Sequence, residues 1–267
     1  MSSKSPGLPK TGGSGSLRRA LKFLGLVLIG AFLVQSMLAV QFSPVVFAQG
    51  LPDLVNLVGR MFPPSLEVVP DVALASLETL QMAVVGTIIA ALLSVPLAFL
   101  AAQNIAPSAI LYHVSRSIII FTRAIPDLIF ALIFVAAVGL GPFPGTLALA
   151  ISSIGMLGKL YAEAIEEIDF GQVEALRSTG SHPLQTLAFG VVPQVTPAII
   201  GMTLYRWDIN IRNSVVLGLV GAGGIGFQLL TSMRLFQYPE VLTIIIFVFV
   251  IILAVERVSS SIRERLI

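Results

Sequence analysis

Long apolar runs constrain the fold of this chain more than any other feature of its sequence. The run from Leu21 to Val40 has about the 20 residues that a helix needs to cross the hydrocarbon core of a bilayer. Hydrophobic residues make up 56% of the chain and charged residues only 11%, whereas soluble domains carry charge on about a quarter of their residues. Five further runs lie at about Leu80–Ala102, Ile118–Val138, Leu147–Ile165, Val195–Leu217 and Val241–Val255. The sequence therefore predicts an all-α, polytopic membrane protein with about six transmembrane helices.

The remaining segments divide the chain into four parts. Residues 1–16 are rich in Ser, Gly, Pro and Lys, which predicts a disordered cytoplasmic tail. Residues 17–72 hold the first transmembrane helix and an extracytoplasmic segment, where apolar residues at helical spacing from Leu54 to Phe62 indicate a short interfacial helix. Residues 73–260 form the core of the remaining helices, and residues 261–267 form a cytoplasmic C-terminus.

Basic residues flank the first and the last apolar run and predict the orientation of the chain. They are Lys4, Lys10, Arg18, Arg19 and Lys22 at the start and Arg257, Arg263 and Arg265 at the end. Cytoplasmic segments carry an excess of Lys and Arg, and an even number of helices returns the chain to the side on which it started. We therefore expect a multi-pass protein in the inner membrane of a prokaryote, with both termini and residues 170–192 in the cytoplasm and residues 218–238 at the outer face.

The glycine-rich stretch GAGGIG has the spacing of a dinucleotide-binding loop. Its glycines are Gly221, Gly223, Gly224 and Gly226. Such a loop binds a phosphate only within a βαβ unit, and here two predicted membrane helices flank it on the side without ATP or NAD. We interpret the stretch as a turn at which helices pack closely or the chain dips into the membrane, and more specifically as a loop that lines an outer gate.

Residue types that bind metals or nucleic acid are scarce. The chain has no cysteine and only two histidines, His113 and His182, which argues against a metal site. Its net charge of +2 gives no support to nucleic-acid binding. A membrane-embedded enzyme would need a nucleophile with its base, or a metal cluster, within the spans, and the sequence indicates neither.

One cytoplasmic loop, residues 169–193, has its own helix signals in the stretch DFGQVEALRSTGSHPLQTLAFGVVP. Asp169 and Gln172 have the spacing of a capping box, which predicts a helix from Phe170 to Thr179. Gly180 then ends this helix, where a left-handed residue is favoured. The residues that start a second helix are Ser181, as its cap, and Pro183, in its first turn. These signals predict a compact helical hairpin, which is either a docking surface or an ordinary connection between two spans.

The same loop resembles the EAA loop of ABC-importer permeases. That motif is Glu-Ala-Ala, three residues, Gly, nine residues and Ile-x-Leu-Pro, and Glu174, Ala175, Gly180 and Pro193 keep its spacing. The departures are Leu176, Gly190 and Val192, which keep most of the apolar character. In that family the loop forms a coupling helix that fits a cleft in a separate ATPase subunit. The resemblance implies that this chain is not an enzyme and binds no cofactor, and that ATP and Mg bind to the partner ATPase.

Three stretches carry a closer resemblance, to phosphonate-transport permeases. They are RAIPDLIFALIFV (Arg123–Val135), GKLYAEAIEEID (Gly158–Asp169) and YRWDINIRNSVVLGLVGAGGIG (Tyr205–Gly226). The resemblance implies a permease core of type I importer architecture over residues 73–260, embedded in lipid and working as a homodimer. It also implies two ATPase subunits and an extracytoplasmic binding protein that delivers a phosphonate or a related phosphorus oxyanion. The alternative is an ion-coupled secondary transporter of a small anion, which has no reason to keep the EAA spacing.

Ionisable residues within the predicted spans are costly in a bilayer and suggest a substrate pathway. Arg123 and Asp127 are four residues apart and share a face of the third span, as do Asp208 and Arg212 in the fifth. The predicted pathway residues are Arg123, Asp127, Tyr205, Asp208, Asn210 and Arg212, beside a polar stripe with Arg206 and Asn213. The three arginines and two aspartates leave one positive charge, which suits an anion held by Arg. Ion pairs that hold spans together use the same residues, so both roles stay open, and Arg212 is the residue that we expect on the anion path.

Overall fold

The computed structural model describes residues 14–266 and contains, over that range, helices and no β-strand. The chain separates into two units, of which the first ends at Leu57 and the second begins at Val58. The first unit holds α1 (Ser14–Ala39) and most of α2 (Pro44–Met61). The predicted boundary at residue 72 stays a prediction.

The structure bears differently on the two predictions for the N-terminal region, the disordered tail and the interfacial helix. The predicted tail lies outside the described residues except for Ser14–Ser16, which begin α1. The predicted interfacial helix from Leu54 to Phe62 coincides with the second half of α2, which starts ten residues earlier, at Pro44. Apolar spacing thus located a helix there but not its beginning.

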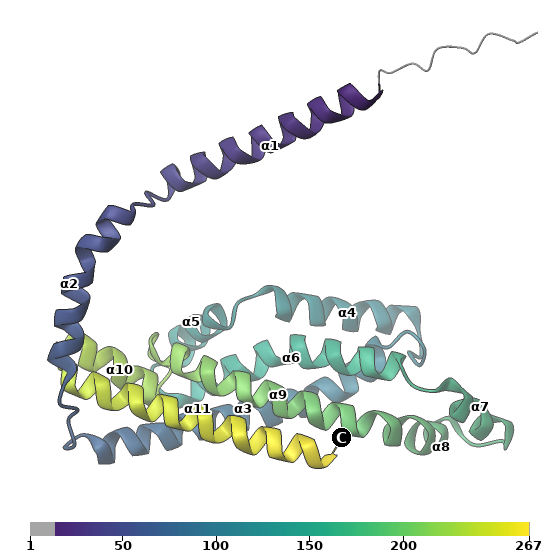
Figure 1. The fold of residues 1–267 in the computed structure, drawn as a ribbon. Helices are drawn as coiled ribbons and strands as arrows, with labels where there is room; N and C mark the ends of the chain where they lie inside the picture. The colour runs from purple at the N-terminus through teal and green to yellow at the C-terminus, as the bar shows by residue number, and fades with distance from the viewer. Residues whose placement is uncertain (1–13, 267) are drawn as a thin grey trace, which may run out of the picture. The chain divides into compact units, whose positions relative to one another are not determined.

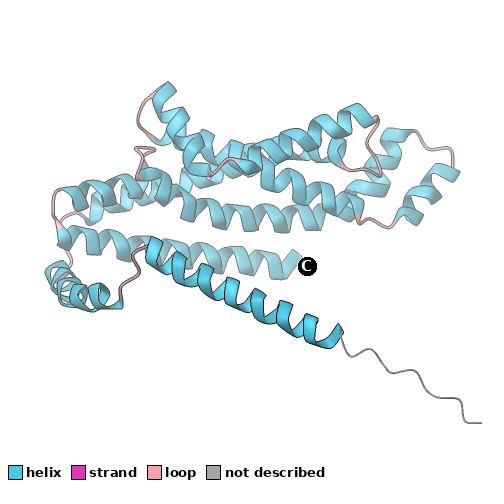
Figure 2. Ribbon diagram, turned by 90° about the horizontal axis from the view of Figure 1, so that it is seen from above, coloured by secondary structure: helices cyan, strands magenta, loops and turns pink. Residues whose placement is uncertain are grey.

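The second unit is a bundle of helices that lie side by side. Figures 1 and 2 show α3, α4, α6, α9 and α11 along its length, with α5 and α10 toward one end and the hairpin of α7 and α8 at the other. The bounds are α3 (Val69–Ala101), α4 (Ala109–Ala124), α5 (Asp127–Val138), α6 (Pro142–Glu166), α7 (Phe170–Ser178), α8 (Pro183–Thr186), the π-helix η1 (Leu187–Val191), α9 (Val192–Gly218), α10 (Gly224–Arg234) and α11 (Tyr238–Leu266).

Small residues let the central helices approach closely. A Cβ added to Gly86 of α3 would lie 3.0 Å from the Cβ of Leu149 in α6. One added to Gly155 of α6 would lie 2.6 Å from the backbone nitrogen of Arg123 in α4. Association of helices in a bilayer depends on van der Waals packing, and small residues permit it by bringing backbones together. Glycines of α3 and α6 therefore place α6 at the centre of the bundle.

The predicted third span, Ile118–Val138, is wrong as a single helix. The structure divides it into α4, which ends at Ala124, and α5, and the two helices are bent by 87°. Ile125 has the extended conformation, with φ −95° and ψ 122°. Pro126 explains the break, because a proline disfavours the helical conformation of the residue before it and has no N–H to donate.

Among the described residues, five helices are long and apolar enough to cross a membrane, and a sixth span results if α4 and α5 count as one. The prediction of about six spans is confirmed in that sense. Several boundaries differ, and the largest differences are at α3, which begins at Val69 rather than near Leu80, and at α11, which continues to Leu266 rather than ending at Val255. The longer α11 places Glu256 inside a membrane-length helix.

Candidate functional site

A buried cluster of polar side chains joins α5, α6 and α9. Arg206 of α9 is only 6% exposed. Its Nε donates to Ser153 Oγ (2.8 Å) and its Nη2 to Ser152 Oγ (3.2 Å), both on α6. The same Nη2 lies 3.5 Å from Asp127 Oδ2, which also accepts a hydrogen bond from Asn213. We call these five residues the buried cluster. The guanidinium of Arg206 thus has partners on two neighbouring helices, α5 and α6.

Arg123 does not pair with Asp127, contrary to the predicted shared face. Arg123 lies in the last turn of α4, whereas Asp127 begins α5 beyond the break at Pro126. Arg123 is exposed, and it forms no ion pair with any residue between positions 14 and 266. The partner of Asp127 is Arg206 instead, and a place for Arg123 on the pathway stays a prediction.

Asn210 joins α9 to two helices from a fully buried position. Its Nδ2 donates to Thr87 Oγ1 of α3 (2.8 Å) and to Ser153 Oγ of α6 (3.0 Å), and the residue is 0% exposed. Interhelical hydrogen bonds of this kind stabilise helix packing in a bilayer. The geometry therefore favours a structural role for Asn210 over its predicted place on the pathway.

A second charged group lies on the surface of α9. Arg212 Nη2 is 2.9 Å from Asp208 Oδ2, the predicted pair four residues apart, and 3.9 Å from Glu256 Oε2 of α11. The side chain of Asp208 is 12% exposed, whereas those of Arg212 and Glu256 are 48% and 57% exposed. Tyr205, also predicted on the pathway, is exposed on the same helix. We call Asp208, Arg212 and Glu256 the surface cluster.

The surface cluster lies midway along the bundle. Ile211, the neighbour of Arg212, packs in one buried group with Ala83 of α3 and Val255 of α11. Ala83 is near the middle of α3, which is long enough to cross a membrane. Ionisable side chains at such a depth face the interior of a bundle or a water-filled cavity. The exposed side of Arg212 is therefore a candidate wall of a pathway.

Glu256 is the member of this cluster that the sequence prediction missed. Apolar residues stop at Val255, so the predicted span ended just before Glu256. In the structure α11 has 29 residues, and Glu256 reaches Arg212. The sequence did contain a signal that the helix extends beyond Val255. The predicted span Val241–Val255 is shorter than the roughly 20 residues that a membrane crossing needs.

The glycine-rich stretch forms the turn between α9 and α10 and packs closely, as interpreted. Positive φ angles occur at Gly221 (88°), Gly223 (77°) and Gly224 (69°). Side chains of α3 bind the first amides of α10, since Gly224 N donates to Glu78 Oε1 (3.1 Å) and Ile225 N to Thr79 Oγ1 (2.8 Å). A Cβ on Gly226 would lie 1.9 Å from a backbone oxygen of α9. Because the amides of Gly224 and Ile225 already donate hydrogen bonds to side chains of α3, the stretch is a packing turn and not a phosphate-binding loop.

The loop of residues 169–193, the coupling loop, begins with α7 as predicted. Asp169 Oδ1 accepts a hydrogen bond from Gly171 N (2.9 Å) and so caps the helix. The backbone nitrogen of Asp169 donates to Gln194 Oε1 (2.9 Å) rather than to Gln172. The predicted capping box is therefore wrong, because the start of α9 supplies the partner that the local sequence was expected to supply.

The turn of the hairpin follows at Gly180, whose φ of 79° is the predicted left-handed conformation. We predicted Ser181 as the cap of α8, but the structure shows that His182 caps it. Ser181 Oγ instead donates to the backbone oxygen of Leu176 (2.8 Å), which ties the turn back to α7. The π-helix η1 then leads into α9, so α7 and α8 are connected without a flexible linker to the helix that carries both arginines.

The predicted coupling residues lie at one end of the bundle (Figure 1). Glu174 and Ala175 are exposed on α7, whereas their neighbour Val173 is 1% exposed and packs into the core. Pro193 is exposed in the first turn of α9. The hairpin thus has a buried side that fixes it to the bundle and a free side that presents the EAA residues.

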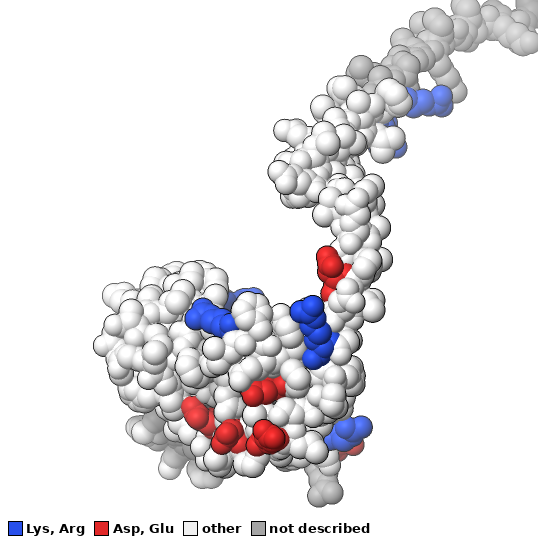
Figure 3. Space-filling model, turned by 90° about the vertical axis from the view of Figure 1, so that its left-hand side faces the viewer, with Lys and Arg blue, Asp and Glu red and all other residues white. Residues whose placement is uncertain are grey.

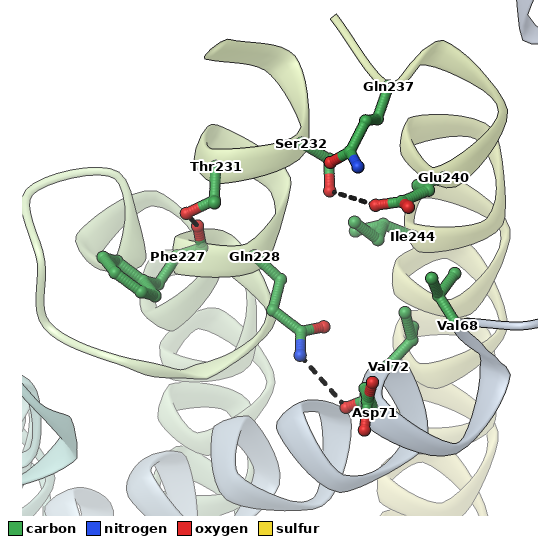
Figure 4. A pocket seen from close by; sticks show the side chains of 10 residues that line it. All are labelled: Val68, Asp71, Val72, Phe227, Gln228, Thr231, Ser232, Gln237, Glu240 and Ile244. Atoms are coloured by element: carbon green, nitrogen blue, oxygen red, sulfur yellow. Dashed lines mark hydrogen bonds between the residues drawn. The ribbon is translucent and has the colours of Figure 1, made fainter. Parts of the chain in front are cut away.

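The opposite end has a cavity of about 210 Å³ between α3, α10 and α11, which both polar and apolar side chains line (Figure 4). Ser232 Oγ donates to Glu240 Oε2 (2.9 Å), and Gln228 Nε2 donates to the backbone oxygen of Asp71 (3.2 Å). Figure 3 views the molecule from this end and shows several acidic side chains gathered on one part of the face.

The bundle of long apolar helices with an exposed helical hairpin between two of them has the fold of solved ABC transporters. The fold matches the MetNI methionine ABC transporter in its inward-facing conformation with a TM-score of 0.66 at 19% identity, over 76% of this chain and 99% of that chain. It also matches an amino acid ABC transporter crystallised with histidines, with a TM-score of 0.62 at 22% identity, over 74% and 95% of the two chains.

The chain belongs to the family of inner membrane components of binding-protein-dependent transport systems, which it matches over residues 94–266. One relative is the phosphate-import permease protein PhnE of Mycolicibacterium smegmatis, 50% identical over 86% of this chain and 43% of that protein. The chain thus spans less than half the length of that relative. Another is the phosphite transport system permease protein PtxC of Stutzerimonas stutzeri, 43% identical over 80% and 78% of the two proteins. Membership of this family supports the importer interpretation over the ion-coupled alternative.

Proposed function

We propose that this chain is the permease subunit through which an ATP-driven importer moves a phosphonate, or a related phosphorus oxyanion, into a prokaryotic cell. The two relatives above are named for the import of phosphate and phosphite, which share a compact anionic phosphorus centre with phosphonates. The observation that carries the proposal is the position of Arg212, midway along the bundle and 48% exposed. A guanidinium in that position can bind an oxyanion through paired N–H donors.

The surface cluster supports a homodimer around a shared pathway. An Arg at the centre of a span costs at least about 2.5–3.5 kcal/mol in hydrocarbon. Arg212 and Glu256 are 48% and 57% exposed in the single chain. This side of α9 and α11 therefore needs a cover of protein or water, which a second copy of the chain facing a water-filled path would supply.

The coupling loop supports contact with two separate ATPase subunits, which would hold ATP and Mg. Glu174 and Ala175 lie on the free side of α7, and a displacement of α7 would pass through η1 to α9 and Arg212. In the proposed orientation this end and both termini lie in the cytoplasm. The end that carries α10 then faces the extracytoplasmic binding protein that delivers the anion.

Uptake by a reconstituted complex tests the function. We expect methylphosphonate to enter proteoliposomes only when the ATPase subunits have ATP and the binding protein is present. Phosphite and phosphate, added as competitors, would then rank the related anions. Uptake that an ion gradient drives without ATP would establish the ion-coupled alternative and refute the proposal.

The variant Gly180→Leu tests the coupling loop. Its φ of 79° is strained for any residue with a side chain, at a cost of about 1–3 kcal/mol, so the turn should shift and misplace α7. We expect the variant to insert in the membrane and to lose ATP-dependent uptake. Gly59→Leu, at a helical glycine of α2 where an added Cβ meets nothing within 4 Å, is the control that should keep uptake. Normal uptake by Gly180→Leu would contradict the assignment.

Single cysteines test the orientation, because the chain has no cysteine of its own. A cysteine in place of Leu235, which is 61% exposed beside α10, should react with a membrane-impermeant maleimide in intact cells. A cysteine in place of Ser178 should react only after the cells are opened. The reverse pattern would overturn the proposed topology.

A further inference from the structure

Glu256 changes the charge balance of the proposed pathway. The residues that sequence reasoning counted were three arginines and two aspartates, which leave one positive charge for an anion. Glu256 lies 3.9 Å from Arg212 and brings this balance to zero. Around Arg212 itself, two carboxylates face one guanidinium, so an anion finds surplus positive charge there only after Glu256 moves away.

The two carboxylates hold Arg212 with unequal strength. Asp208 Oδ2 lies at 2.9 Å, a hydrogen-bonding distance, and its side chain is 12% exposed. Glu256 Oε2 lies at 3.9 Å, beyond the roughly 3.2 Å limit of a good hydrogen bond, and its side chain is 57% exposed. Asp208 is thus a fixed partner, whereas Glu256 is a loose one on another helix.

Arg212 also keeps donors for a further partner. Both contacts use Nη2, and Nε and Nη1 form no hydrogen bond or ion pair with the part of the chain that the structure describes. Arg206 differs, since both its Nε and its Nη2 donate to serines. An edge of a guanidinium that holds two oxygens of one anion joins Nη2 to either Nε or Nη1. When Glu256 leaves Nη2, that nitrogen therefore has a free donor beside it.

We propose that Glu256 stands in for the substrate anion in the empty transporter and is displaced from Arg212 when a phosphonate or related oxyanion binds. The inference rests on the proposed function. In the empty state the carboxylate of Glu256 partly balances the charge of Arg212 midway through the membrane, where an uncompensated charge is costly. One oxygen of a phosphonate takes the place of the Glu256 carboxylate at Nη2, and a second oxygen accepts a hydrogen bond from the free Nε or Nη1. Glu256 acts through Arg212 and is therefore a positioning residue.

Binding of methylphosphonate to the purified permease–ATPase complex, without the binding protein, tests this exchange. Glu256→Gln removes the competing charge and should lower the dissociation constant about two- to fivefold, the range for a half-exposed ion pair. Glu256→Asp, with a shorter side chain, should shift it in the same direction by less. Glu163→Gln removes the carboxylate of another half-exposed pair, Lys159–Glu163 at 3.2 Å, and should leave the constant unchanged.

A second readout needs no ligand. Modification of Arg212 by butanedione, followed by mass spectrometry of the assembled complex, should be faster in Glu256→Gln than in the wild type and unchanged in Glu163→Gln. An unchanged modification rate, or unchanged or weaker binding of methylphosphonate, in assembled Glu256→Gln would overturn the inference. Failure of the proposed function is a different result, namely no ATP-dependent uptake of methylphosphonate by the complete wild-type system.

Discussion

The two arginines of α9 meet carboxylates in different ways. Arg206 is 6% exposed and has Ser152, Ser153 and Asp127 as partners on neighbouring elements. Arg212 is 48% exposed and has one firm partner, Asp208, four residues earlier on its own helix. A charge in a membrane helix stabilises the packing when the protein satisfies its donors, and it is available to a ligand when some donors stay free. The contacts of the buried cluster favour a structural role, whereas the surface cluster is the candidate for transport.

Arg206→Leu should have the largest effect, on assembly. It removes the interhelical contacts of Arg206 with Ser152, Ser153 and Asp127, and hydrogen bonds of a charged group contribute about 1.5–3 kcal/mol each. We expect most of the assembled complex to be lost, as measured by size-exclusion chromatography and by thermal unfolding in detergent. The double variant Arg206→Leu with Asp127→Leu should recover a large part of the loss. Normal assembly of the single variant would remove the distinction between the two clusters.

Arg212→Leu should impair transport more than assembly. It leaves Asp208 without its partner, but that contact lies within α9 and no hydrogen bond between helices is lost, so assembly should fall less than in Arg206→Leu. Uptake per assembled complex should fall about tenfold, which corresponds to the loss of one hydrogen bond to a charged group. If the loss of uptake merely followed the loss of assembled complex, Arg212 would belong with Arg206.

Local spacing was sufficient to predict one of these clusters in part and not the other. Asp208 and Arg212 share a turn of a continuous helix, so their contact followed from the helical period. The same reasoning failed for Arg123 and Asp127, because Pro126 ends the helix between them. The true partner of Asp127 lies on α9, and only the packing of α5 against α9 brings the two together.

The coupling loop shows the same limit at its caps. The turn at Gly180 was predictable, because a left-handed residue after a helix favours glycine. The partner of the Asp169 amide was not, since Gln194 follows 25 positions later in the chain. Glu256 likewise depended on how far α11 extends beyond its apolar run, which hydropathy alone does not fix. The family and the helices could be predicted, whereas contacts between distant residues needed the structure.

Glu163→Gln should have the smallest effect and serves as the matched control for spacing. Lys159 and Glu163 are four residues apart like the Asp208–Arg212 pair, and they are 38% and 42% exposed. Such a pair contributes about 0.3–0.5 kcal/mol, so thermal unfolding and uptake should stay close to the wild type. A loss of uptake comparable to that of Arg212→Leu would contradict the account, because the Lys159–Glu163 and Asp208–Arg212 pairs would then matter equally for transport despite their different positions along the bundle.

The double variant Arg212→Leu with Asp208→Leu tests the central claim most directly. Removing both partners leaves no uncompensated charge, so the complex should assemble better than the Arg212→Leu single variant. The measurement is ATP-driven methylphosphonate uptake per assembled complex. If Arg212 meets the anion, uptake stays about tenfold below the wild type, the deficit expected for the lost charged hydrogen bond. Full recovery of uptake in the double variant would contradict the account and leave Arg212 as a structural partner of Asp208.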